Sequence, residues 1–116
     1  MTGEAKRRVR GSSTGRPIMV LLDLLGRRWA LRIVWELRNG PLTSRALRQA
    51  CGDVSPTVLQ ARLGELRQAR LVSLSPGAGY QLTELGVEMG SALLPLLVFS
   101  ERWSWALRAE GSDEAQ

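Results

Sequence analysis

The chain has 116 residues, 44% of them hydrophobic, which is enough for one domain with a modest core. Its net charge is +5 at pH 7, and a basic excess in so small a domain is typical of proteins that bind a polyanion. The lack of histidine and the single cysteine, Cys51, exclude a His/Cys metal cluster, a Ser-His-Asp or Cys-His catalytic group and an internal disulfide. We therefore expect a protein that is not an enzyme and has no metal site or cofactor.

Two features predict a cytoplasmic protein with no membrane partner. No signal peptide is visible at the N-terminus. The longest apolar run, residues 92–99, is far shorter than the roughly 20 residues that span a bilayer.

Residues 1–16 are predicted to form a flexible basic arm. They interleave basic residues with glycine, serine and threonine, contain one acidic residue, Glu4, and show no apolar period. Such an arm is either a solvated tail or a segment that follows a phosphate backbone or enters a minor groove. Its candidate DNA contacts are Lys6, Arg7, Arg8 and Arg10.

Two helices are expected after the arm. Pro17 can begin a helix, and residues 17–25 are apolar on almost every side, apart from Asp23. A second copy of the chain is the expected cover for the face that its own domain does not bury. A helix from about Trp29 to Arg38 follows, with Trp29 either a core residue between helices or a stacking surface for a ligand. The expected buried residues of this second helix are Ala30, Ile33, Val34 and Leu37.

The centre of the chain has the pattern of a helix-turn-helix. Thr43 is a suitable N-cap for a short helix, a four-residue turn from Cys51 to Val54 follows, and Ser55 and Pro56 begin a longer helix. On the short helix, the apolar face is expected to hold Ala46, Leu47 and Ala50, and the outward face Arg45, Arg48 and Gln49.

The longer helix is expected to end at Arg70 and has two contrasting faces. The buried stripe consists of Leu59, Leu63 and Leu66, and the opposite face of Thr57, Gln60, Ala61, Gly64 and Gln68. This opposite face is uncharged and small, although glycine inside a helix costs about 1 kcal/mol relative to alanine. It is either a neutral exposed face or a surface that approaches DNA, where glutamine can pair with an adenine edge and threonine and alanine methyls can contact thymine. The candidate base contacts are Thr57, Gln60, Ala61 and Gly64, and the candidate phosphate contacts are Arg45, Arg48, Ser55 and Arg67.

A β-hairpin is predicted directly behind this helix. Residues 71–75 and 80–82 alternate apolar and polar side chains, and residues 76–79 are typical of a turn. A hairpin in this place is the wing of a winged helix. The expected fold class is therefore mainly α with a small β-hairpin wing, a winged helix-turn-helix with terminal dimerisation helices.

The last helix is expected to start after the capping residue Thr83, to reach about Leu107 and to bend near residues 91–94 because of Pro95. Its apolar residues point in too many directions for one buried face, so we expect it to be the main dimer element. The expected interface residues are Ile18, Leu21, Leu22, Leu25, Leu97, Phe99, Trp103 and Trp105. The predicted organisation is thus the arm, a domain over residues 17–108 and a flexible acidic tail over residues 109–116.

Several stretches in order resemble the HxlR-type family of bacterial winged-helix regulators, which are relatives of the MarR group. The resemblance covers nearly all of residues 17–107. It rests on Leu22-Asp23-Leu24-Leu25-Gly26-Arg27-Arg28-Trp29, Gly40-Pro41-Leu42, Val54-Ser55-Pro56 with Leu59, Arg62-Leu63 and Glu65-Leu66, then Leu71-Val72, Tyr80-Gln81-Leu82-Thr83-Glu84-Leu85-Gly86 and Leu93-Leu94-Pro95-Leu96-Leu97. It implies a transcription regulator, expected to be a repressor, that binds a palindromic double-stranded DNA operator as a homodimer with one recognition helix in each half-site. Some members sense oxidants, aldehydes or small aromatic ligands.

The sequence departs from the family pattern at three places. Redox- and aldehyde-sensing members have a cysteine just before the first helix, where this chain has Arg16-Pro17, so that sensor is missing. Cys51 lies elsewhere, in the predicted turn, and is either structural or a redox site. The hairpin has no arginine or lysine between residues 71 and 82, and we expect the arm to supply the missing groove or phosphate contacts. Thr57 and Gly64 stand where basic residues are common, and Arg62 makes either a DNA contact or an ion pair inside the domain.

Two other functions fit the same pattern. The neutral helix face could dock a partner protein, which would make the chain an assembly module. Alternatively, the regulator could respond to a small apolar effector bound in a pocket between Trp29, Trp35 and the partner's terminal helix.

Overall fold

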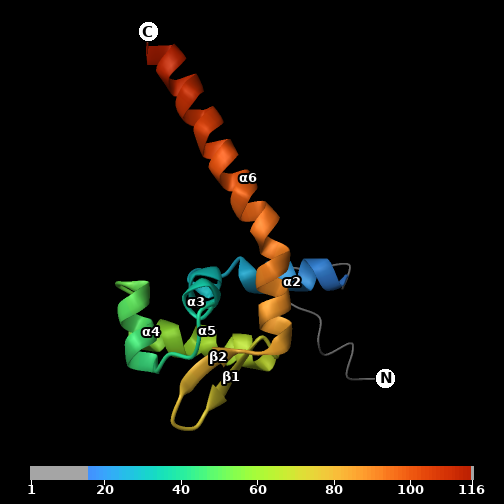
Figure 1. The fold of residues 1–116 in the computed structure, drawn as a ribbon, viewed down its shortest axis with the longest axis vertical. Helices are drawn as coiled ribbons and strands as arrows, with labels where there is room; N and C mark the ends of the chain where they lie inside the picture. Colours follow the sequence, from blue (N-terminus) through green and yellow to red (C-terminus); the bar gives the residue numbers. More distant parts are fainter. Residues whose placement is uncertain (1–15, 116) are drawn as a thin grey trace.

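The computed structural model describes residues 16–115, with side chains up to residue 111. Figure 1 shows a cluster of short helices with a hairpin beneath it and one long helix rising from it. The elements are α2 (Pro17–Leu25), α3 (Ala30–Glu36), α4 (Ser44–Cys51), α5 (Pro56–Gln68), β1 (Val72–Ser75), β2 (Gly79–Leu82) and α6 (Glu84–Ala115). The mainly α fold with a hairpin wing is confirmed.

One hydrophobic core joins the short helices to the hairpin. The residues predicted to be buried in and just after α3 (Ala30, Ile33, Val34 and Leu37) and in α5 (Leu59, Leu63 and Leu66) are all buried. The same core includes Leu47 of α4, Val54 of the turn and Val72 of β1. Periodicity therefore identified correctly which helix faces pack inward.

Both expected N-caps of the helix-turn-helix are present. The Thr43 hydroxyl oxygen accepts a hydrogen bond from the Ala46 amide, and the Ser55 hydroxyl oxygen accepts one from the Val58 amide, each at 3.1 Å. These bonds satisfy amides that have no partner within the helices and define where α4 and α5 begin.

The ends of α4 and α5 differ from the prediction. Cys51 was expected in the turn but forms the last residue of α4, because its side chain lies one helical turn after Leu47 and is buried beside the same core. The helix α5 ends at Gln68 and not at Arg70. Arg70 has a φ of 63°, and the Leu71 amide donates back to the Leu66 carbonyl at 3.0 Å, a turn that ends the helix and directs Leu71 into the core.

The wing, defined as β1, β2 and the turn between them, is an antiparallel hairpin as predicted. Val72 lies opposite Leu82, and Ser75 lies opposite Gly79. The wing is attached to the segment before α4 by two backbone hydrogen bonds between Leu42 and Tyr80, at 2.9 and 2.8 Å. Gly79, at a φ of +104°, permits this attachment, because a Cβ atom there would collide with the Leu42 carbonyl.

The helix α6 is longer than the sequence indicated. It continues through the segment expected to be a flexible tail and ends at Ala115, not near Leu107. That segment contains no proline and includes alanine and glutamate, which favour helix. With 32 residues the helix is about 48 Å long, and Figure 1 shows that its distal part extends beyond the other elements and is inclined to its first turns. Pro95 lies inside it. No helix within residues 16–115 is long and apolar enough to cross a membrane.

Candidate nucleic-acid interface

The outward face of α5 is open to solvent along its length. The four candidate base contacts, Thr57, Gln60, Ala61 and Gly64, are all exposed, whereas the leucines of the same helix are buried. A Cβ atom built on Gly64 meets no atom within 4 Å. Internal packing therefore gives no reason for glycine at this position.

The candidate phosphate contacts lie on α4, on α5 and at the N-cap of α5. Arg45 on α4 and Arg67 in the last turn of α5 are exposed. Arg48 is also exposed, but its Nε donates to the Val54 carbonyl at 3.2 Å, so only its terminal nitrogens are available to a ligand. Ser55 accepts the capping bond through Oγ, which leaves the hydroxyl proton free to be donated to a phosphate oxygen.

Arg62 belongs to an ion-pair cluster and does not point outward. Its Nε donates to the Arg28 carbonyl at 3.0 Å, and its NH1 donates to Glu65 at 2.6 Å. The other carboxylate oxygen of Glu65 accepts a hydrogen bond from Arg27 at 2.9 Å. We name Arg27, Arg62 and Glu65 the Glu65 cluster. It ties α5 to the segment between α2 and α3, which fits the ion-pair alternative for Arg62.

Tyr80 is a residue of this surface that the sequence did not single out. Its hydroxyl lies 3.4 Å from Oε1 of Gln60, so the buried ring from β2 reaches the outward face of α5. The alternation of residues 80–82 predicted a strand but did not say which way Tyr80 points. No local pattern could show which residue of α5 it meets, since the two are 20 positions apart.

The other expected sources of DNA contacts are the wing and the arm. The wing carries no basic residue between residues 71 and 82. The candidate arm contacts, Lys6, Arg7, Arg8 and Arg10, lie outside the described residues.

The residues expected at a dimer interface fall into three groups. Those that are exposed are Ile18, Leu22, Leu97, Phe99, Trp103 and Trp105. Leu21 is half-buried and packs against the core of its own domain. Leu25 was assigned wrongly, because it is only 7% exposed and is part of that core, where the end of α2 turns into α3.

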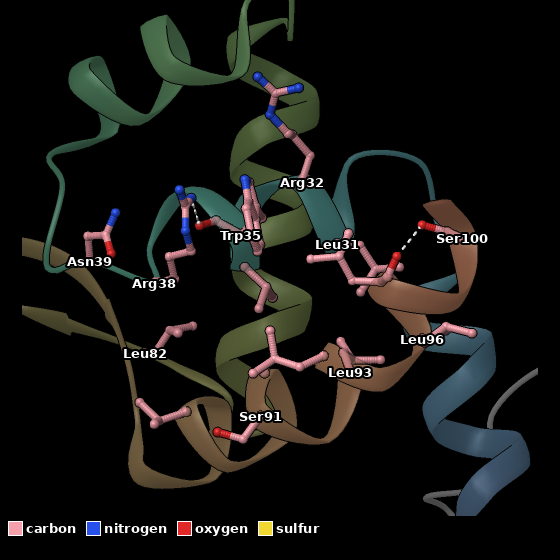
Figure 2. Close-up of a pocket in the computed structure, with 15 residues that line it drawn as sticks. Leu31, Arg32, Trp35, Arg38, Asn39, Leu82, Ser91, Leu93, Leu96 and Ser100 are labelled. Atoms are coloured by element: carbon pink, nitrogen blue, oxygen red, sulfur yellow. Dashed lines mark hydrogen bonds between the residues drawn. The ribbon is translucent and has the colours of Figure 1, made fainter. Parts of the chain in front are cut away.

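A groove of about 690 Å³ lies between α3 and α6. Figure 2 shows Leu31 and Trp35 of α3 on one side and Leu93 and Leu96 of α6 on the other. The Arg38 guanidinium lies 3.8 Å from the centre of the Trp35 ring, so a cation is held at the rim. Trp29 does not line the groove, contrary to the pocket expected from the sequence; it packs against the core.

Cys51 is buried, in agreement with the structural alternative for this residue. Burial is the main effect that raises the pKa of its thiol, and nearby Glu36 raises it further, while Arg32 lowers it. A thiol with a raised pKa is protonated near neutral pH and is a poor nucleophile.

Comparisons with known proteins agree with this arrangement. The profile of HxlR-like helix-turn-helix proteins matches residues 24–107. The quinone-bound form of YodB from B. subtilis is 33% identical, with 80% of this chain and 98% of that chain covered and a TM-score of 0.61. A structure from Thermoplasma volcanium, described as a "possible HxlR family transcriptional factor", is 29% identical, with 77% and 85% covered and a TM-score of 0.68. A MarR-family regulator from Enterococcus faecalis shares the fold at 22% identity, with 87% and 97% covered and a TM-score of 0.72. The comparison with curated proteins gives no match.

Proposed function

The chain belongs to the HxlR-like helix-turn-helix family of DNA-binding transcriptional regulators, which are not enzymes, and from this premise we propose that it is a repressor that binds a palindromic operator as a homodimer. The observation that carries the proposal is the uncharged, exposed face of α5, together with the exposed residues Arg45 and Arg48 on α4 and Arg67 on α5. A solvated helix face has no need to avoid charge, whereas a face that reads base edges benefits from short, neutral side chains.

In this proposal, α5 is the recognition helix and lies in the major groove. Base edges are read by Thr57, Gln60, Ala61 and Gly64, and phosphates are bound by Arg45, Arg48, Ser55 and Arg67. Phosphate contacts set the position of the helix on the duplex, and base contacts set the sequence preference. The arm residues Lys6, Arg7, Arg8 and Arg10 supply further contacts that the uncharged wing lacks.

The homodimer is supported by apolar surface that the chain leaves uncovered. Trp105 is 70% exposed, Val98 67% and Phe99 56%, all on α6. The radius of gyration is 17.0 Å, against about 13 Å for a compact domain of 100 residues. A second copy that covers α6 and the exposed side of α2 would bury these side chains and set the two recognition helices about one turn of DNA apart.

The test is a footprint on the promoter next to the regulator's own gene, combined with the salt dependence of binding. We expect a protected palindrome and a log-log slope of about −0.9 for each phosphate contact. Deleting the arm, residues 1–16, should weaken binding and make that slope shallower. A flat salt dependence in the full chain would favour the assembly module, since an apolar protein interface depends little on salt.

A second candidate function, regulation by a small apolar effector, is favoured by the groove between α3 and α6. The groove has apolar walls with Arg38 at its rim, and the relative from B. subtilis has been solved with a quinone bound. Titration with a hydrophobic quinone should quench the fluorescence of Trp35 and release the operator. Gly90→Leu, which places a side chain in open space within the groove, should abolish the quenching. Quenching that persists in this variant would place the ligand elsewhere.

A further inference from the structure

The hydroxyl of Tyr80 occupies a fixed position beside the outward face of α5. The backbone amide and carbonyl of Tyr80 are both bonded to Leu42, and its residue surface is only 8% exposed. Gly79 allows the backbone to approach Leu42 closely, so the strand cannot shift easily at this point. A ring held by both its backbone and its packing has little freedom to move its hydroxyl.

Gln60, in contrast, is exposed and would rotate freely without a partner. Among the hydrogen bonds found within residues 16–115, the one from Tyr80 is the only one that its side chain makes. Of its outward neighbours on α5, Ala61 and Gly64 offer no polar side chain, and Thr57 makes no hydrogen bond to it. At 3.4 Å the bond is longer than the usual 2.7–2.8 Å between hydroxyl and acceptor oxygens, so it adds little stability but favours one amide orientation.

That orientation determines which end of the amide is offered to a ligand. The phenol donates its proton to Oε1, so the carbonyl end of Gln60 faces the wing and the NH₂ end faces solvent. An amide that is free to turn can pair with adenine, because Oε1 then accepts from the adenine amino group while NH₂ donates to N7. With Oε1 turned toward Tyr80, the side chain presents a donor.

We propose that Tyr80 is a positioning residue that makes Gln60 read a guanine, an inference that rests on the proposed function. In the major groove guanine presents two adjacent acceptors, O6 and N7, whereas adenine presents one acceptor and one donor. A side chain that presents its NH₂ end to the base therefore favours guanine over adenine. This differs from the adenine pairing expected for an unconstrained glutamine at this position.

The experiment measures binding to operators in which every base pair is substituted in turn, with the wild type, Gln60→Ala and Tyr80→Phe. The position where Gln60→Ala loses discrimination identifies the base that Gln60 reads. There we expect the wild type to prefer guanine, and Tyr80→Phe to lower the ratio of guanine to adenine affinity about two- to threefold, the low end of the range for one lost hydrogen bond because this bond is long. Phenylalanine keeps the ring in the core, and thermal unfolding of the variant checks that the fold is intact.

A double-mutant cycle separates positioning from a general effect of the wing. In the Gln60→Ala background, Tyr80→Phe should leave the base preference at that position unchanged, since the amide it orients is gone. Ser73→Ala is the matched control, because it also removes a hydroxyl from the wing. Ser73 pairs with Gln81 and so lies on the opposite face of the hairpin from Tyr80. This variant should keep the guanine preference.

The outcomes are distinct. A wild-type preference for adenine at the Gln60 position, or a guanine preference that survives Tyr80→Phe, would overturn the positioning role while leaving the regulator intact. If the wild type bound no duplex in a sequence-dependent manner, the proposed function would fail first and the inference with it.

Discussion

Gly64 lowers the stability of α5, and no contact within the protein explains why glycine is present there. It lies in the middle of α5, and its surroundings leave room for a methyl group. We therefore expect Gly64→Ala to stabilise the protein by about 1 kcal/mol, seen as a higher midpoint of thermal unfolding. The same methyl would stand between α5 and DNA, so operator affinity should fall. A variant that is more stable and binds equally well would show that this face does not approach DNA closely.

Cys51 gives a prediction on pH. Its pKa in the folded chain is raised by burial, so the folded state holds the thiol proton more tightly than the unfolded state does. The resulting stabilisation is complete below the pKa of the unfolded thiol, about 8.5, and is lost as pH rises through the higher pKa of the folded protein. Urea unfolding at pH 7 and pH 10 should therefore show a larger loss of stability for the wild type than for Cys51→Ala. An equal loss in both proteins would argue against a buried, protonated thiol.

For single residues, the sequence predicted which side chains face outward better than it predicted which side chains they contact. Thr57, Gln60 and Gly64 were placed on the exposed face by counting 100° per residue, which needs only the helix itself. The contacts of Gln60 with Tyr80 and of Glu65 with Arg27 depend on how separate elements pack, and they join residues 20 and 38 positions apart. Spacing within one helix carries no information on such pairs.

Among the elements, α5 is held in place by the Glu65 cluster as well as by its leucines. The carboxylate of Glu65 accepts from two arginines, and the three side chains are between 20% and 38% exposed. Glu65→Gln keeps the shape but removes the charge, and we expect it to lower the free energy of unfolding by about 1 to 2 kcal/mol.

The matched control for this change is Glu36→Gln, which alters an ion pair formed with Arg32 inside α3. A pair four residues apart on one helix contributes about 0.3–0.5 kcal/mol, so the control should have the smaller effect in chemical denaturation. Equal losses in the two variants would mean that the Glu65 cluster does not fasten α5 to the rest of the domain.

Element boundaries were harder to predict than element types. Pro17 and Pro56 marked the first residues of α2 and α5, and Ser55 capped α5, because these signals act locally. The ends of α4, α5 and α6 depended on burial of Cys51, on the positive φ of Arg70 and on the absence of a breaker after Pro95. Trp29, the residue before α3, is a further case, since its φ of 79° is unusual for a large residue and nothing in the local sequence signals it.

For the whole molecule, the apolar part of α6 supports the prediction of a homodimer. Trp103 is 55% exposed, and a charge placed there would be buried without a partner if a second copy covered the helix. We expect Trp103→Glu to convert the dimer to a monomer in sedimentation experiments and to weaken operator binding, because two linked half-sites bind more tightly than one.

Arg102→Glu introduces the same side chain at the neighbouring position, which faces another direction on the helix. It should leave the dimer intact. A wild-type protein that sediments as a monomer at micromolar concentration would contradict the prediction directly.

The length of α6 has a consequence for which subunits would pair with one another in a cell. If two copies pack along α6, each helix contributes several large apolar side chains to the interface. Dissociation of the dimer would then expose all of this apolar surface to water at once. Subunit exchange would then be slow compared with synthesis, and a cell that makes two related paralogues would keep the pairs that form first. Slow dissociation of the homodimer would thus limit the formation of heterodimers with paralogues.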